Sequence, residues 1–281
     1  MNTEYSLEKS ANLAVIMSLY KNDRLEIVKL AVESILSQTY KDFDYYIQFD
    51  GAIDASVEVY LRGLKDERIK ISARSENKGL AYSLNELLQI VMPKGYEYIA
   101  RMDADDISMP DRFEKQLAYL ETHKDIDCLG GAINEIDETG GDRNKITRYP
   151  CDPVEARRFF SKRNPVAHPT VMMRRSIFDK AGCYYPTDFV RNEDTMLWYK
   201  AYMGEAKIAN LPDVLLNFRM TDAMFTQRRN GKVFAKSQLE MRKIINKDLQ
   251  FGAIANCYAY AMYLLMISPS WLLKLAYRIL R

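Results

Sequence analysis

The sequence predicts an α/β fold built on a mostly parallel central sheet with helices on both faces. Short apolar runs alternate with longer runs through the first two-thirds of the 281 residues. In the longer runs apolar residues recur every three or four positions, which is the helical period. Strands separated by helices of this length form strand–helix–strand units, in which neighbouring strands run parallel.

The first elements follow one another closely. Residues 13–18 (LAVIMS) form an almost continuous apolar run, which predicts a buried strand. Residues 24–37 follow with leucine, valine and isoleucine at helical spacing. The alternation continues with strands expected at 45–49, 69–72 and 98–102 and helices expected at 55–64 and 80–91.

The second part of the chain is more varied. A helix is expected from Arg112 to about Thr122. Asp152 then opens another helix as its N-cap, with Pro153 at the first helical position and Glu155 at the third, which is typical of a helix start. The other expected elements are strands at 128–133 and 171–173, a helix at 193–203 and a largely solvated helix at 232–247.

Composition excludes several classes of protein. The 40 Lys+Arg and 38 Asp+Glu give a formal net charge of +2, whereas dedicated nucleic-acid binders usually carry a strong basic excess. The four cysteines form no CxxC pair and the chain has 2 histidines, so we expect reduced thiols and no zinc site. The polar first residues lack the apolar core of a signal peptide. We therefore expect a cytoplasmic protein with no nucleic-acid partner.

The end of the chain has a different character. Residues 249–273 carry no charge, although Asn256 and the Ser-Pro-Ser at 268–270 interrupt the apolar sequence. Beyond Pro269 one helical face carries Trp271, Leu272, Leu275 and Ile279, and another carries Lys274, Arg278 and Arg281. An apolar helix followed by a basic amphipathic helix is typical of a segment that lies in the membrane interface. Two alternatives are a buried core or dimer helix and a true membrane span.

Three carboxylates follow the strand expected at 98–102. Asp103, Asp105 and Asp106 repel one another unless a cation or hydrogen-bond donors hold them. Hard oxygen ligands of this kind suit Mg²⁺ or Mn²⁺, which often complete their coordination with substrate phosphates. The alternative is an acidic turn that caps the next helix, and the spacing alone does not choose between the two.

Other charged residues could act together with these carboxylates. Glu193 and Asp194 start an expected helix, where the helix dipole also favours acidic side chains. Arg228 and Arg229 lie in a glycine-containing loop that could close over an anion. Two single arginines are weaker candidates for the same anion, Arg191 and Arg219. The set makes sense if a metal and arginines share a diphosphate while a second carboxylate serves as base.

Taken in this order, the segments resemble the family 2 glycosyltransferases, inverting enzymes with the GT-A nucleotide-diphospho-sugar transferase fold. The resemblance covers residues 12–229 and is carried mainly by ARMDADDISMPDR (100–112) and NEDTML (192–197). Similar segments are VIMSLYKND (15–23), SILSQTYKDF (34–43), ENKGLAYSLNE (76–86) and NPVAHPTVMMRRS (164–176).

Within the family the chain looks most like the bacterial enzymes that build surface polysaccharides such as O-antigen, capsule or exopolysaccharide. In that subgroup an RRxG loop follows the base helix, and RRNG (228–231) matches it. The resemblance implies a catalytic domain over 1–230, with a nucleotide-sugar half to about 112 and an acceptor half to about 230. C-terminal helices would occupy 231–281, as a possible membrane-association segment.

The resemblance also implies roles for individual residues. Asp105 would ligate a Mn²⁺ or Mg²⁺ ion that bridges the donor diphosphate. Asp194 would be the catalytic base, with Glu193 beside it. Nucleotide contacts would come from Ser18, Tyr20, Asp50 and Asp103, with Arg228 and Arg229 as a clamp on the pyrophosphate. Further donor or acceptor contacts are expected from Asn77, Asp106 and Arg191.

Two aromatic residues have a second interpretation beside the functional one. His168 lies in a segment that the resemblance places beside the donor sugar, although a histidine that hydrogen-bonds a loop is the first interpretation. Trp198 could stack on a sugar face, or it could be a core residue of the helix at 193–203.

The chain departs from the family pattern in two respects. The family commonly has Asp-Asp-Gly-Ser after its second strand, whereas residues 49–52 are Phe-Asp-Gly-Ala, which predicts altered base contacts there. No downstream histidine is suited to be a third metal ligand. The usual Asn-x-Gly is retained at 77–79.

The resemblance implies a metal-dependent inverting glycosyltransferase that moves a sugar from a UDP-sugar to a hydroxyl of a lipid-diphosphate-linked saccharide. Peripheral docking on the cytoplasmic face of the inner membrane would bring the enzyme to that acceptor, and an oligomer is possible. One alternative is a nucleotidyltransferase that makes nucleotide sugars, which needs a glycine-rich loop that residues 18–22 lack. Another is a non-catalytic membrane-associated scaffold with the same fold.

Overall fold

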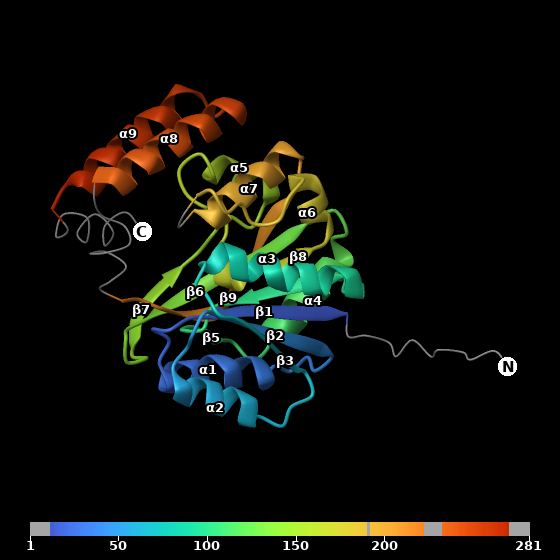
Figure 1. The fold of residues 1–281 in the computed structure, drawn as a ribbon. Helices are drawn as coiled ribbons and strands as arrows, with labels where there is room; N and C mark the ends of the chain where they lie inside the picture. The colour runs from blue at the N-terminus through green and yellow to red at the C-terminus, as the bar shows by residue number, and fades with distance from the viewer. Residues whose placement is uncertain (1–11, 190–191, 222–231, 270–281) are drawn as a thin grey trace.

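The computed structural model describes residues 12–189, 192–221 and 232–269. Its first half is a run of strands joined by helices (Figure 1). The elements are β1 (Leu13–Leu19), α1 (Leu25–Leu36), β2 (Phe43–Asp50), α2 (Ala55–Gly63), β3 (Ile69–Arg74), α3 (Leu80–Val91), a short 3-10 turn (Met92–Lys94) and β4 (Tyr98–Met102). β1 pairs in parallel with β2 and β4, and β2 pairs in parallel with β3. The carboxyl ends of these four strands therefore lie at one edge of the sheet.

The second half adds strands of both directions. Its elements are β5 (Ile107–Ser108), α4 (Arg112–Thr122), β6 (Cys128–Ile136), β7 (Asp142–Thr147), α5 (Pro153–Phe159), the 3-10 turn η2 (His168–Thr170), β8 (Met172–Arg174), α6 (Ser176–Ala181), α7 (Glu193–Met203) and β9 (Ile208–Arg219). Within the described residues the sheet order is β3-β2-β1-β4-β8-β6-β9-β5, with β7 beside β6. β8 lies antiparallel between β4 and β6, and β9 runs parallel to β6.

Each face of the sheet has its own core, because successive strand side chains point to opposite faces. On β4, Tyr98, Ala100 and Met102 pack with α1, α2 and α4, whereas Ile99 packs with α3, α6 and α7. Figure 1 shows α1 and α2 below the sheet and α3, α6 and α7 above it. Arg101 follows the same alternation as Ile99. Its side chain therefore lies on the face that α3 and α7 cover. Arg101 is also close in sequence to the acidic turn, which contains Asp103, Asp105 and Asp106.

The expected α/β fold with helices on both faces is confirmed, and several elements begin and end where the sequence predicts. α3, β4, α4 and α7 have the expected bounds. Asp152 caps α5 through its carboxylate, which accepts from the backbone N–H groups of Val154 and Glu155. Four elements are not predicted by the sequence pattern, namely β5, β7, α6 and β9.

β9 escapes the sequence pattern because Pro212 and Asp213 interrupt its apolar residues. The register between β6 and β9 shifts at this place, between Gly131 and Ile133. Residues of this strand nevertheless pair with β6 on one side and with β5 on the other. β7 is polar and mostly exposed, so no apolar alternation marks it.

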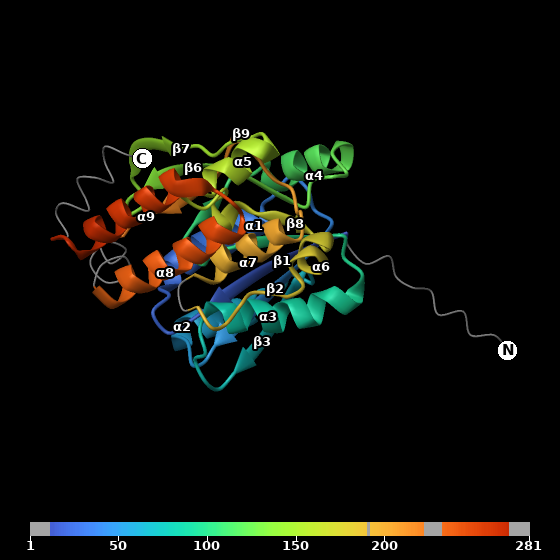
Figure 2. The same ribbon diagram turned by 90° about the horizontal axis from the view of Figure 1, so that it is seen from above.

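The C-terminal helices α8 (Lys232–Asp248) and α9 (Gly252–Ile267) lie side by side in both ribbon views (Figures 1 and 2). The expectation that α8 is largely solvated is wrong for one face, because Met241 and Ile245 enter the core beside α7. Arg242 also donates from Nη1 to the carbonyl of Phe160 at 2.7 Å. α8 is thus fixed to the rest of the molecule.

α9 has a different environment from α8. Of its residues, Ala255 and Ala259 are buried, whereas Ile254, Tyr260 and Leu264 are exposed. Among the described residues no helix has both the length and the apolar character needed to cross a membrane. The basic amphipathic helix expected at 271–281 lies outside the described residues.

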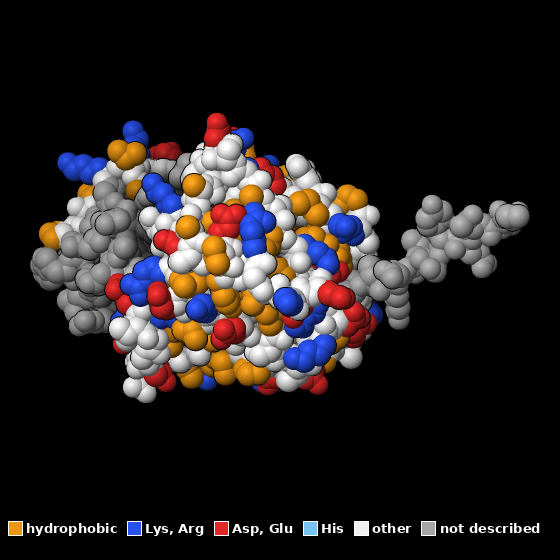
Figure 3. Space-filling model, turned by 60° about the horizontal axis from the view of Figure 1, so that its bottom comes forward, with side chains coloured by type: hydrophobic (Ala, Val, Ile, Leu, Met, Phe, Trp, Pro, Cys, Tyr) orange, Lys and Arg blue, Asp and Glu red, His pale blue; other side chains and the backbone are white. Residues whose placement is uncertain are grey.

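The lower surface of the molecule, where α1 and α2 lie, carries acidic and basic side chains interspersed with apolar ones (Figure 3). This mixture is consistent with a chain whose positive and negative charges almost balance. The clustered acidic side chains lie instead at the carboxyl ends of the parallel strands.

Candidate active site

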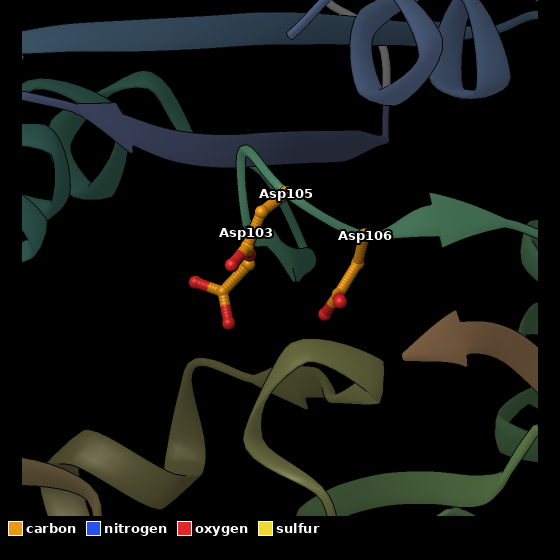
Figure 4. Close-up of side chains that lie close together, drawn as sticks. All are labelled: Asp103, Asp105 and Asp106. Carbon is orange, nitrogen blue, oxygen red and sulfur yellow. The ribbon is translucent and has the colours of Figure 1, made fainter. Parts of the chain in front are cut away.

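The three aspartates of the acidic turn lie at the end of β4, at the carboxyl edge of the parallel strands. Their side chains project from the turn into the same space (Figure 4). One oxygen of each of Asp103, Asp105 and Asp106 lies within 4.8 Å of the others. Asp106 is buried, whereas Asp103 and Asp105 are partly exposed. A cation could therefore reach this acid cluster from solvent and find hard oxygen ligands close together.

Each end of the acid cluster is held by an arginine. Arg101, only 2% exposed, bonds through Nη2 to the carboxylate of Asp103. The backbone N–H of Arg219 donates to Oδ1 of Asp106 at 2.8 Å. Burial, followed by the charges of Asp105 and Asp103, raises the pKa of Asp106 well above its usual range. Burial and mutual repulsion thus oppose full ionisation of the three carboxyl groups, and an added cation would offset that repulsion.

The second acidic group is the pair Glu193 and Asp194, which begins α7. The Asp194 carboxylate accepts a hydrogen bond from the backbone N–H of Thr195 at 2.6 Å and another from Nδ2 of Asn164 at 2.8 Å. The hydroxyl of Thr195 in turn donates to Oδ1 of Asn164 at 2.9 Å, which fixes the orientation of that amide. Asp194 is therefore held in one position by groups from two segments.

Burial governs the pKa of both acids. It raises the pKa of Asp194, while the N–H of Thr195 and the charge of Arg101 act against the rise. Burial and then the charge of Asp194 raise the pKa of Glu193 to about 7, and Asp103 contributes in the same direction. Arg101 lowers the pKa of both acids. One buried guanidinium thus stabilises the ionised forms of the α7 pair while it bonds to the acid cluster.

The nucleotide-side residues lie along the same edge. Ser18 lies near the end of β1 and Tyr20 directly follows that strand, and both are partly exposed. β1 lies next to β4, where Met17 pairs with Met102. The backbone N–H of Tyr20 donates to the carboxylate of Asp23 at 2.8 Å, which closes the turn after β1. The structure therefore brings Ser18 and Tyr20 to the edge that carries the acid cluster.

Asp50, at the end of β2, forms its hydrogen bonds with other groups of the protein. Its carboxylate bonds to Arg74 and accepts from the backbone N–H groups of Lys78 and Gly79 at 2.7 and 2.9 Å. Asn77 donates from Nδ2 to the carbonyl of Asp50 at 3.1 Å. These bonds assign Asp50 to support of the loop at 77–79, and a contact with the base stays a prediction. Arg74 belongs to this network, although nothing in its sequence context marks it.

Gly51 allows the close packing of this loop. Its φ is +80°, a conformation that favours glycine. A Cβ added there would also lie 2.7 Å from the backbone nitrogen of Asn77. A side chain at position 51 would therefore displace the loop that Asp50 holds.

His168 and Trp198 lie in the interior. His168 is bonded through Nε2 to the hydroxyl of Tyr185 at 2.9 Å, and burial followed by the charge of Arg101 lowers its pKa well below the usual range. This agrees with the structural interpretation of His168. Trp198 is 0% exposed and packs edge-on against His168. The prediction that Trp198 stacks on a sugar is wrong, because neither ring face is open.

Three of the predicted site residues lie outside the described residues: Arg191, Arg228 and Arg229. Three others were not singled out by sequence reasoning but contact the site, namely Arg74, Arg101 and Asn164. A signal existed for Asn164, which opens the segment 164–176 of the resemblance. Arg101 directly precedes the acidic motif within 100–112, where its charge is the only sign of a role.

Solved structures share the fold of this chain. S. aureus TarS in complex with UDP-GlcNAc matches with a TM-score of 0.63 at 15% identity, over 89% of this chain and 70% of that one. The mannosyltransferase PcManGT from Pyrobaculum calidifontis, in complex with GDP-Man and Mn2+, matches with a TM-score of 0.61 at 15% identity, over 96% and 80%. The fold is that of the GT-A glycosyltransferases.

The sequence comparison identifies the family. Residues 14–182 match the model described as Glycosyl transferase family 2. The amylovoran biosynthesis glycosyltransferase AmsE of Erwinia amylovora is 32% identical over 82% of this chain and 84% of its own length. A UDP-Gal:alpha-D-GlcNAc-diphosphoundecaprenol beta-1,3-galactosyltransferase of Escherichia coli is 24% identical over 83% and 82%. The chain belongs to the family 2 glycosyltransferases.

Proposed function

We propose that this glycosyltransferase transfers a sugar from a UDP-sugar to a hydroxyl of a growing surface polysaccharide, with inversion at the anomeric carbon. The observation that carries the proposal is the relation between the two acidic groups. Asp194 is held by Asn164 at the start of α7, and buried Arg101 acts on Asp194 while it bonds to Asp103 of the acid cluster. Arg101 thus links the proposed base to the proposed site for the leaving diphosphate.

Asp194 acts as the general base in this mechanism. Its carboxylate takes the proton of the acceptor hydroxyl as the hydroxyl oxygen attacks the anomeric carbon and the bond to the diphosphate oxygen breaks. One displacement of this kind inverts the anomeric centre. Burial raises the pKa of Asp194 toward the value that suits a base near neutral pH. Asn164 and Thr195 orient the carboxylate for the transfer.

Asp105 would hold Mn²⁺ or Mg²⁺ together with the donor diphosphate. The donor set fits such a cation, because carboxylate oxygens of the three aspartates lie within 4.8 Å of one another and Asp105 is partly exposed. When bound, the cation would supply positive charge that offsets the charge of the leaving diphosphate. The Mn2+ in the PcManGT complex supports this assignment.

The donor and acceptor are proposed from the relatives. The galactosyltransferase of Escherichia coli is named for UDP-Gal and a diphosphoundecaprenol-linked acceptor, and TarS was solved with UDP-GlcNAc. AmsE is named for amylovoran biosynthesis. These names support the proposal of a UDP-sugar donor and a lipid-diphosphate-linked saccharide acceptor for this chain.

A lipid-linked acceptor calls for docking at the cytoplasmic face of the membrane. The uncharged helix α9 exposes Ile254, Tyr260 and Leu264 and offers such a surface. The basic residues at 274–281 would add attraction to anionic lipids, at about 1 kcal/mol for each Lys or Arg near the membrane surface.

A thermal-shift screen of nucleotide sugars with and without Mn²⁺ tests the donor site. A donor at about 100 times its Kd stabilises the folded state by about 2.7 kcal/mol, so Tm should rise by roughly 5–10 °C. UDP-sugars should give this rise only with Mn²⁺. No rise with any nucleotide sugar would reject the proposal. Release of UDP from the bound donor then separates an enzyme from a non-catalytic scaffold.

A further inference from the structure

Arg219 is the last residue of β9 and is almost completely buried, at 3% exposed. β9 pairs with β5, which directly follows the acidic turn, and Ile107 is opposite Asn217. Arg219 therefore reaches the acid cluster from a strand more than a hundred residues later in the chain. The sequence marks it as a candidate contact for an anionic ligand, but its side chain donates hydrogen bonds to backbone carbonyls of the protein.

Within the described part of the chain, four hydrogen bonds of Arg219 join three segments. Its backbone N–H donates to Oδ1 of Asp106 at 2.8 Å, and its Nε donates to the backbone carbonyl of Asp105 at 2.8 Å. Its Nη1 donates to the carbonyls of Asp137 and Glu138, both at 3.1 Å. The side chain thus ties the acidic turn to the turn between β6 and β7.

These bonds fix both the backbone and one carboxylate of the acid cluster. With the carbonyl of Asp105 held inward by Nε, the carboxylate of Asp105 is left partly exposed at the carboxyl edge of the sheet. Asp106 has one oxygen bonded to the Arg219 N–H, while its Oδ2 is buried and finds no hydrogen-bond partner among the described residues. An oxygen left without a donor in a buried cluster is costly unless a cation binds near it.

We propose that Arg219 is a positioning residue for the divalent cation: it holds Asp105 and Asp106 in the arrangement that binds Mn²⁺ or Mg²⁺. This inference rests on the proposed metal site. Arg219 contacts neither the cation nor the donor and acts through the turn. The rigid guanidinium bonds to two turns at once, which a lysine ammonium on a flexible stem cannot reproduce.

The experiment measures Mn²⁺ binding, which is independent of turnover. Free Mn²⁺ is followed by electron paramagnetic resonance as it is titrated into full-length protein in the presence of UDP. Loss of a group that orients metal ligands typically lowers metal affinity by about 10–100-fold. Arg219→Met should show a loss of this size and Arg219→Lys a smaller one.

Arg174→Met is the matched control. Arg174 is also a largely buried arginine, with bonds to Ile126, Glu97 and Tyr98, but it pairs with the first residue of β4, at the opposite end of that strand from Asp103. The Arg174→Met variant should lose about as much stability as Arg219→Met and keep wild-type Mn²⁺ affinity. An equal loss in both variants would mean general destabilisation and would overturn the inference.

The remaining outcomes separate the inference from the proposed function. If wild type binds no Mn²⁺ with UDP, the metal site itself is absent and both fail. If wild type binds Mn²⁺ and Arg219→Met binds it equally well, the positioning role alone is wrong. Should Arg219→Met show no cooperative melting transition, Arg219→Lys decides, and wild-type Mn²⁺ affinity in that variant would overturn the inference.

Discussion

Asn164 donates from its side-chain amide to Asp194 at 2.8 Å, and its own amide oxygen accepts from Thr195, the residue after Asp194. Each of the three side chains therefore fixes the next. Asn164 lies in the loop before η2 and Asp194 starts α7, so that a loop and a helix far apart in the sequence hold one carboxylate. This arrangement supports the proposal that Asp194 is the base.

Asp194→Asn should leave donor binding intact and lower sugar transfer by roughly 10²–10⁴-fold, which is the usual contribution of a general base. The amide is nearly isosteric but cannot take a proton at neutral pH. Glu193→Gln should lower transfer less, because Glu193 would only lie beside the base. Transfer rates with UDP-sugar and acceptor measure both effects. Near-normal turnover of the Asp194 variant would place the base elsewhere, with Glu193 as the first candidate.

Asn164→Ala tests the orienting bond. A hydrogen bond to a charged group contributes about 1.5–3 kcal/mol, so kcat should fall roughly 10- to 100-fold. Since that bond favours the ionised form, its loss should raise the pKa of Asp194 further. The acid limb of the kcat–pH profile should then move to higher pH. A uniform loss at every pH would indicate that Asn164 does not act through the ionisation of Asp194.

Glu193→Gln should also change how stability depends on pH. The pKa of Glu193 is raised from 4.5 to about 7 by burial and by Asp194. The folded state therefore keeps this proton longer than the unfolded chain, and stability is lost as pH rises from about 4.5 to 7. Glutamine does not ionise, so the Glu193→Gln variant does not lose this stability.

Melting in EDTA measures the effect without a bound cation. The Tm of Glu193→Gln should match wild type below pH 4.5 and exceed it above pH 7. Glu240→Gln, on the exposed surface of α8, is the control and should show no such gain. An equal Tm for Glu193→Gln and wild type at pH 8 would show that burial does not strain this carboxylate.

Asp105→Ala should abolish Mn²⁺-dependent binding of UDP and leave the fold intact, because Asp105 is the proposed ligand and its side chain is partly exposed. Asp103→Ala should weaken nucleotide binding more mildly. Calorimetric titration of UDP with and without Mn²⁺ measures both. Equal Mn²⁺-dependent affinity in wild type and the Asp105 variant would remove this aspartate from the metal site.

Truncation after Gly252 should reduce binding to vesicles and preserve UDP binding. The buried residues of α9 are Ala255 and Ala259, and Asn256 accepts a hydrogen bond from Asn246. Removal of α9 therefore exposes little of the core. Flotation with vesicles containing anionic lipid compares the truncated and full-length chains, and high salt should detach the full-length chain. Insoluble truncated protein would assign the segment to the core or to a dimer interface.

The elements with regular patterns could be predicted from the sequence. α3 and β4 begin and end where apolar periodicity places them, and Asp152 caps α5 as its neighbours predict. β9 could not be predicted, because Pro212 and Asp213 break its pattern and pairing with β6 decides its conformation. Local sequence also gives no reason for the antiparallel direction of β8, which is set by its neighbours β4 and β6.

The candidate site divides in the same way. Asp103, Asp105 and the pair at 193–194 could be found from spacing and from the resemblance. The roles of Asn164 and Arg219 could not, since each depends on a partner that the fold brings near. Arg101 bonds to Asp103 two residues away, but its effect on the pKa of Asp194 also depends on the fold. Trp198 shows the opposite error: an aromatic residue beside the base looked suited to a sugar, but tertiary packing buries both ring faces.

The anomeric configuration of the product tests the central claim most directly. Purified protein is incubated with Mn²⁺, an α-linked UDP-sugar and a lipid-diphosphate-linked saccharide, and the new linkage is assigned by proton NMR coupling constants. A single displacement with Asp194 as base predicts a β-linkage in wild type and none above background in Asp194→Asn. An α-linked product would contradict the inverting mechanism and the role assigned to Asp194.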